Sequence, residues 1–130
     1  MLDDVWKEML AAVQAVRNTR RLSEFIVAGA VGAAILSASG KIYTGVSVDA
    51  ACALGICAER NAILHMITNG EQEIRRVVCV MEDGTIGSPC GACREWMAQL
   101  MPENYKQIAF LWDAGGTTVT LGELTPKWWI

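Results

Sequence analysis

The sequence predicts an α/β protein, specifically a three-layer α-β-α sandwich built on a mixed five-stranded sheet. Two observations lead to this class. The chain opens with an amphipathic helical segment and a strand pair, and two strand–helix alternations follow. The continuous apolar run at residues 77–80 is typical of a central strand covered on both faces. Helices that alternate with strands pack on the faces of the sheet, so three layers result.

The first half of the chain is expected to contain a helix, a hairpin and a second helix. Apolar residues at three- and four-residue steps indicate the first helix, and the turn signal Ser39–Gly40 separates the two strands. The second helix is closed by Asn69–Gly70 and is apolar on more than one face, around Ile63 and Met66, which predicts contact with another subunit. The expected elements are a helix at 2–17, strands at 25–37 and 41–48, a loop at 49–55 and a helix at 56–68.

The second half repeats the order of strand and helix and then adds a strand pair. Pro102 ends the helix, and the chain closes with Trp128 and Trp129. No repeat, linker or low-complexity segment interrupts it, so we expect a single domain at residues 1–130. The expected elements are a strand at 75–81, a loop at 82–89, a helix at 90–101, strands at 108–112 and 117–121, and a tail at 123–130.

Composition argues against several classes of function. The net charge is -3 and no run of Lys or Arg occurs, which disfavours a nucleic-acid partner and base editing of nucleic acids. No apolar stretch reaches the roughly 20 residues that a membrane span needs. The chain begins with an acidic segment, unlike a secretion signal, and its five cysteines fit reduced thiols. We therefore expect a cytoplasmic protein without a membrane partner.

Two cysteine motifs predict a metal site. Cys90 and Cys93 have the C-x-x-C spacing that presents two thiolates to one metal, and Cys57 supplies a third sulfur from upstream. Both motifs fall at expected helix N-termini, where backbone N–H groups and the helix dipole stabilise thiolates. Three protein ligands leave the fourth corner of a tetrahedral zinc open for water, as a catalytic site requires. The motifs therefore predict a catalytic Zn²⁺ site on these three cysteines.

Two charged residues follow the first cysteine. Glu59 is placed to move protons to and from water at the metal. Three thiolates around Zn²⁺ leave a net negative charge, which weakens the effect of the metal on its water. Arg60 offsets this charge if its guanidinium donates to the sulfur of Cys57 or Cys90. Arg94 is a weaker candidate for the same role.

These motifs resemble the homotetrameric cytidine deaminase family over nearly the whole chain. The resemblance implies zinc on the three cysteines, Glu59 as proton shuttle, Arg60 acting on the thiolates, and backbone groups at Ala58 and Ser88 holding the pyrimidine. It also implies a homotetramer that deaminates a cytosine nucleoside, cytidine or deoxycytidine, with release of ammonia. The matching segments are residues 31–36, 40–45, 57–60, 88–94 and 123–126.

The departures from the family lie where it holds the sugar. Ser47 and Asp49 stand at the positions of an Asn-x-Glu pair, and Gly29 replaces a Phe. We expect Ser47 and Asp49 still to bind the substrate in a wider pocket, because Gly29 removes an aromatic wall, with the two tail tryptophans partly closing it. The related blasticidin S deaminases also differ here and end in an aromatic tail. Deamination of such a cytosine-bearing antibiotic is therefore the alternative function.

Plainer interpretations of the same residues stay open at this point. The three cysteines, with Cys52 as a fourth ligand, would form a structural zinc site. Glu59 would then be an ordinary first-turn residue favoured by the helix dipole, and Arg60 a surface cation. The chain would be a non-catalytic subunit, although such a subunit has no need of a proton shuttle. His65 is interpreted as a packing or interface residue and Cys79 as a core residue.

Overall fold

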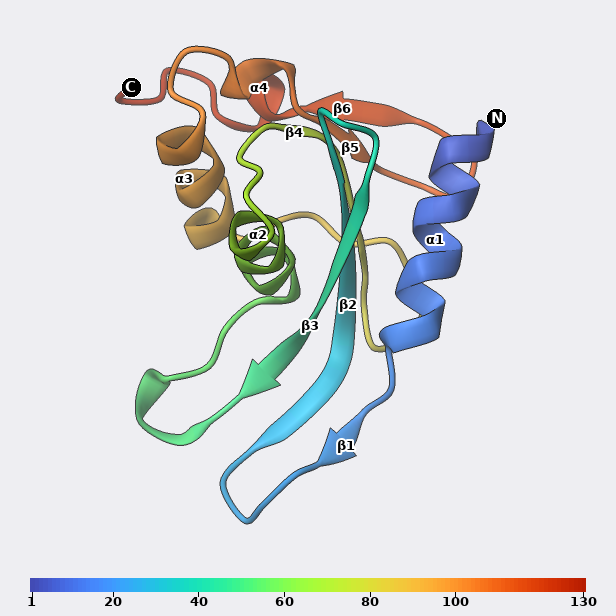
Figure 1. Cartoon of the computed structure of the whole chain (residues 1–130), viewed down its shortest axis with the longest axis vertical. Coiled ribbons are helices and arrows are strands. Elements are labelled where there is room, and N and C mark those ends of the chain that lie inside the picture. Colours follow the sequence, from blue (N-terminus) through green and yellow to red (C-terminus); the bar gives the residue numbers. More distant parts are fainter.

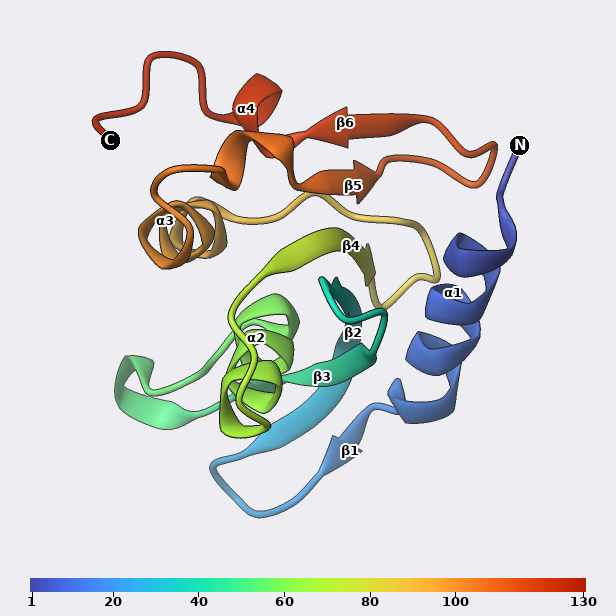
Figure 2. The same ribbon diagram turned by 45° about the horizontal axis from the view of Figure 1, so that its top comes forward.

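In the computed structural model, which describes residues 1–130, one twisted sheet lies between α1 on one face and α2 and α3 on the other (Figures 1 and 2). None of the helices is long and apolar enough to cross a bilayer. The helices are α1 (Asp4–Val16), α2 (Ala58–Thr68), α3 (Gly91–Leu100) and α4 (Leu121–Leu124), with 3-10 turns η1 (Ala51–Ala53) and η2 (Tyr105–Gln107). The strands are β1 (Arg20–Arg21), β2 (Val27–Ser37), β3 (Ile42–Asp49), β4 (Ile74–Val80), β5 (Ala109–Leu111) and β6 (Thr118–Thr120).

Strand β2 is the centre of the sheet. It pairs antiparallel with β3 along one edge and with β4 along the other. Strand β5 runs parallel to β4, and β6 runs antiparallel to β5. The predicted three-layer sandwich with a mixed sheet is therefore confirmed. The sheet has six strands rather than the expected five, because the two-residue β1 pairs with the start of β2 and is too short to leave a periodic signal.

A separate apolar core lies on each face of the sheet. The apolar stripe of α1 covers one face, which confirms the amphipathic pattern of the first helix. The cluster on that face consists of Trp6, Met9, Val13, Ala34, Val78, Val80 and Leu111. The larger cluster on the other face joins α2, α3 and the sheet, and both expected zinc-binding motifs therefore start beside it.

Helix α2 is apolar on more than one face, as expected. Ile63 and Met66 are fully buried in the core between the helices and the sheet, so these two residues lie on the inner face of the helix. The exposed apolar side chains of this helix are Leu64 and Ile67, which are 38% and 39% exposed. Apolar residues at consecutive positions blur the helical period, and only the packing decides which of them face inwards.

Gly45 of β3 allows α2 to lie directly on the sheet. A Cβ atom added at Gly45 would come within 2.3 Å of the Ala62 backbone nitrogen and 2.7 Å of the Ala58 carbonyl oxygen. The Asn61 side-chain amide donates to the Val46 carbonyl oxygen over 3.0 Å and holds the same two elements together. These contacts set the position of the start of α2.

We expect the Gly45→Ala variant to have a free energy of unfolding lower by about 1–3 kcal/mol, the usual cost of overpacking. The opposing atoms belong to the helix backbone and cannot rotate away, so α2 would have to move off β3. Thermal denaturation followed by circular dichroism measures this change. Gly91→Ala is the matched control, because a Cβ atom at Gly91 meets nothing within 4 Å. Equal destabilisation of the two variants would contradict the explanation.

Candidate active site

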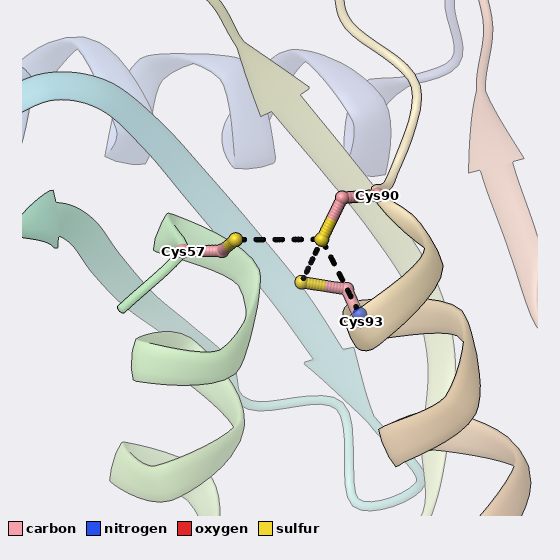
Figure 3. A group of neighbouring side chains, drawn as sticks. All are labelled: Cys57, Cys90 and Cys93. Atoms are coloured by element: carbon pink, nitrogen blue, oxygen red, sulfur yellow. Dashed lines mark hydrogen bonds between the residues drawn. The ribbon is translucent and has the colours of Figure 1, made fainter. Parts of the chain in front are cut away.

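Three cysteines from the starts of two helices converge on one point (Figure 3). Cys57 is the N-cap of α2, Cys90 is the N-cap of α3, and Cys93 lies in the first turn of α3. The Sγ atom of Cys90 is 3.4 Å from that of Cys57 and 3.4 Å from that of Cys93. All three sulfurs lie within 4.8 Å of one another. The fold thus brings together the three residues that the sequence suggested as metal ligands.

The spacing of these sulfurs fits one zinc ion. Ligands at a Zn–S distance of about 2.3 Å in a tetrahedron lie roughly 3.8 Å apart, a value within the range of separations in the cluster. Cys52, the possible fourth ligand of a structural site, is exposed on η1 and does not belong to the cluster. Three thiols without a fourth protein ligand are the donor set of a catalytic site rather than of a structural one.

The start of α3 stabilises a thiolate at Cys90. Burial alone would raise the pKa of the Cys90 thiol, but hydrogen bonds from the backbone N–H groups of Cys93 and Ala92 and from the neighbouring thiols hold this pKa below its usual value. The Cys93 N–H group lies 3.4 Å from the Cys90 sulfur (Figure 3). Burial raises the pKa of the Cys93 thiol. A metal ion reverses that preference, because a coordinating thiol is deprotonated.

Glu59 is almost completely buried, with 4% of its surface exposed. Burial raises the pKa of its carboxyl group, while hydrogen bonds from its own backbone N–H group and from the Cys79 and Cys93 thiols act in the opposite direction. A carboxyl group with a raised pKa holds and releases a proton more readily near neutral pH, which suits a general acid–base catalyst. Cys79, which the sequence suggested only as a core residue, is buried and also lies beside this carboxyl group.

Arg60 reaches the thiol cluster, whereas Arg94 does not. The Nη2 atom of Arg60 lies 3.4 Å from the Cys57 sulfur, and this hydrogen bond raises the pKa of the guanidinium group. Arg94 donates instead to three oxygen atoms outside the cluster. The expectation that Arg94 helps to neutralise the thiolates is therefore wrong. Arg94 directly follows Cys93, and neighbouring residues of a helix point in different directions.

A cavity of about 290 Å³ opens over the cluster. It lies between the start of α2, the end of β3 and the loop before α3. The four residues suggested for substrate binding all line it, together with Glu59 and Arg60. Sequence reasoning missed the walls contributed by Val31 and Met81, because only the pairing of the strands brings them to the cavity. The four suggested residues are Ser47, Asp49, Ala58 and Ser88.

Gly29 has a role other than the expected one. Its φ is +87°, and a Cβ atom there would lie 2.1 Å from the Asn18 carbonyl oxygen, so no side chain fits at this position. Gly29 does not line the cavity, and the explanation that it widens the pocket is wrong. The pairing of β2 with β3 is irregular in this region, and the Ser47 hydroxyl accepts a hydrogen bond from the Val31 N–H group over 3.0 Å. This bond occupies one acceptor position of the Ser47 hydroxyl oxygen, so fewer hydrogen-bonding positions remain for a substrate.

The C-terminal tail lies against α3 rather than over the cavity. The Trp129 indole N–H group donates to the Glu95 carboxylate over 2.7 Å, and Trp128 packs on the larger core. The Tyr105 hydroxyl donates to the Ile130 carbonyl oxygen over 3.3 Å. Neither tryptophan lines the cavity, so the tail does not close it within one chain as expected.

Comparison with known families agrees with this site. Residues 6–108 match the model of the cytidine and deoxycytidylate deaminase zinc-binding region. The chain belongs to this deaminase family. Zinc is therefore its cofactor, and the three-cysteine cluster is able to hold the ion.

The relatives of this chain include two kinds of enzyme. This chain is 33% identical over 97 residues to a cytidine deaminase of Halalkalibacterium halodurans, with 74% of each chain covered. It is 31% identical over 107 residues to a blasticidin-S deaminase of Bacillus cereus, again with 74% of each chain covered. The crystal structure of cytidine deaminase from Mycobacterium leprae has a TM-score of 0.75 and 28% identity, and the match covers 96% of this chain and 100% of that chain.

Proposed function

We propose that this chain is a zinc-dependent hydrolytic deaminase that converts cytidine or deoxycytidine to the uracil nucleoside and releases ammonia. The observation that carries the proposal is the buried carboxyl group of Glu59, which lines the same cavity as the thiols of Cys57 and Cys90. A structural zinc site has no use for a buried carboxyl group that faces a cavity. The proposal includes a single domain at residues 1–130, which is supported by the one sheet that joins all the strands.

In the proposed mechanism the thiolates of Cys57, Cys90 and Cys93 would hold the zinc ion, which would supply an activated water for attack on C4 of the cytosine ring. Glu59 takes the first proton that the water loses and delivers it to N3. It then passes the second proton to the amino group, and the C4–N bond breaks to release ammonia. Backbone groups of Ala58 and Ser88 hold the pyrimidine. Burial of Glu59 supports this role, because it raises the pKa of the carboxyl group and so favours the protonated state that Glu59 passes through before each delivery.

Three further residues of the cavity complete the proposed site. Arg60 lowers the negative charge on the metal ligands, and its 3.4 Å contact with the sulfur of Cys57 supports this role. Ser47 and Asp49 bind the sugar, which their position on the cavity wall supports. The Ser47 hydroxyl already accepts a hydrogen bond from the Val31 backbone N–H group, so Asp49 would provide most of the hydrogen bonding to the sugar.

The purified, zinc-loaded protein should deaminate cytidine and deoxycytidine, because both present the same ring to the metal and to Glu59. The loss of ultraviolet absorbance as the amino group leaves measures the rate directly, and a coupled assay for ammonia confirms the product. A sample without zinc is the control and should be inactive. Absence of turnover in protein shown to contain zinc would contradict the proposed function.

A cytosine-bearing antibiotic of the blasticidin S type is the second candidate substrate. The similarity to a blasticidin-S deaminase nearly equals that to a cytidine deaminase, and it covers the same share of both chains. The presence of Ser47 and Asp49 in place of the family's sugar-binding pair also favours it. The same assay decides between the candidates, because kcat/KM for blasticidin S should exceed that for cytidine if resistance is the function.

We also infer that the chain assembles as a homotetramer. Several large apolar side chains are exposed in the single chain, including Leu64 and Ile67 on α2 and Phe25 before β2. Leu64 and Ile67 are three residues apart on α2 and therefore lie on one side of the helix, and an exposed apolar patch commonly marks a contact with another protein chain. Contact through Leu64 and Ile67 would place the subunit interface on the helix that begins at the zinc cluster.

A further inference from the structure

We propose that Arg94 is a positioning residue that ties the Ser88–Cys90 segment of the active site to the C-terminal helix α4. The inference rests on the proposed function, since it treats the cavity as the place of catalysis. Arg94 belongs to α3, but its side chain turns away from the zinc cluster. It donates three hydrogen bonds to acceptors on two segments that are far apart in the sequence.

The three acceptors surround the guanidinium group at equal distances. Its Nε atom lies 2.9 Å from the Pro89 carbonyl oxygen, and Nη2 lies 2.9 Å from the Ser88 hydroxyl. Its Nη1 atom lies 2.9 Å from the Leu124 carbonyl oxygen at the end of α4. A guanidinium group presents its N–H donors in a rigid planar fork, so these bonds hold the acceptors in one arrangement.

Helix α4 is a firm anchor for this arrangement. Leu121 is fully buried, and Thr120 and Glu123 form a capping box at the start of the helix. The Thr125 hydroxyl donates to the Leu121 carbonyl oxygen over 2.7 Å. The last carbonyl groups of a helix lack partners within the helix and carry partial negative charge, so a guanidinium group is a favourable partner for Leu124.

The segment held by Arg94 lines the active site. Ser88 and Cys90 both face the cavity, and Cys90 belongs to the thiol cluster. No other hydrogen bond of the chain reaches the Ser88 hydroxyl. Loss of the Arg94 side chain would therefore free Ser88, which faces the substrate, and loosen Cys90, while Glu59 on α2 would keep its place.

The Arg94→Ala variant should release zinc to a chelator about tenfold faster than the parent, the lower end of the usual loss when a direct partner of a metal ligand is removed, because Arg94 supports Cys90 only through the two residues before it. Its KM for cytidine should rise by about tenfold or more, and kcat per bound zinc should fall less than KM rises. Added guanidinium ion should partly restore both values. Arg94→Lys should not restore them fully, because an ammonium group cannot match three acceptors in the fork.

Arg76→Ala is the matched control. The Arg76 guanidinium donates to both Asp3 carboxylate oxygens, over 3.0 and 2.8 Å, and lies 4.8 Å from the centre of the Trp6 ring, away from the cavity. This variant should lower the melting temperature but leave zinc release and KM unchanged. An Arg94→Ala variant that behaves in the same way would overturn the proposal.

The experiment still tests the positioning role if Arg94→Ala does not fold or if the parent protein does not deaminate cytidine. If Arg94→Ala does not fold, Arg94→Lys takes its place, and zinc release from that variant at the parental rate would overturn the proposal. Zinc release does not depend on turnover. If the parent does not deaminate cytidine, the proposed function fails, while the comparison of zinc release between the Arg94 and Arg76 variants still tests the positioning role.

Discussion

The Glu59→Gln variant should keep its zinc and its fold and lose activity by about 10²- to 10⁴-fold, the usual contribution of a general acid–base group. Glutamine has nearly the same shape as glutamate but cannot take up and release a proton. The fold should persist because burial disfavours the charged carboxylate and raises the pKa of Glu59, so a neutral amide is no harder to bury. The measurements are kcat, the zinc content per chain and the melting temperature.

Glu8→Gln is the matched control for that experiment, because Glu8 lies exposed on α1, on the opposite face of the sheet from the cluster. It should leave kcat unchanged. Near-parental turnover by Glu59→Gln would remove Glu59 from the mechanism. Loss of zinc from that variant would instead mean that the carboxyl group supports the metal directly.

The Cys90→Ala variant should lose most of its zinc and, with it, almost all activity. Cys90 has the central sulfur of the cluster, 3.4 Å from each of the other two, and the start of α3 favours its thiolate. Removing a ligand should weaken zinc binding by more than the roughly 10- to 100-fold that follows loss of a supporting partner. Metal analysis after dialysis against a weak chelator measures the effect.

Cys52→Ser is the matched control, because it removes a thiol that lies outside the cluster. Cys52 is exposed on η1 and does not belong to the cluster, so this variant should retain about one zinc per chain. If Cys90→Ala holds zinc as well as Cys52→Ser does, the cluster is not the metal site. If Cys52→Ser loses its zinc, Cys52 is a fourth ligand and the site is structural.

Much of the zinc site could be read from the sequence because its signals are local. The spacing of Cys90 and Cys93 places two sulfurs on one turn of a helix, whatever the rest of the chain does. Glu59 follows Cys57 by two residues, so the same helix start presents both. Their convergence with the second motif followed from the fold class, which sets two helices side by side on one face of the sheet.

Other features had no clear local signal. Strand β1 has two residues and is defined only by its pairing with β2. Helix α4 has four residues, and its capping box at Thr120 and Glu123 is a signal that could have revealed it. The burial of Ile63 depended on which side of α2 meets the sheet, and Gly45 sets that approach from another strand.

By itself, the sequence determined the fold class, the three thiols and the carboxyl group beside them, because residue type and short-range spacing decide metal chemistry and helix starts. The tertiary structure decided that Arg94 turns towards α4, that Gly29 packs against Asn18, and that Val31 faces the cavity. Each of these depends on contacts between segments far apart in the chain. Such contacts arise from strand register and helix packing, which a pattern within one segment does not encode.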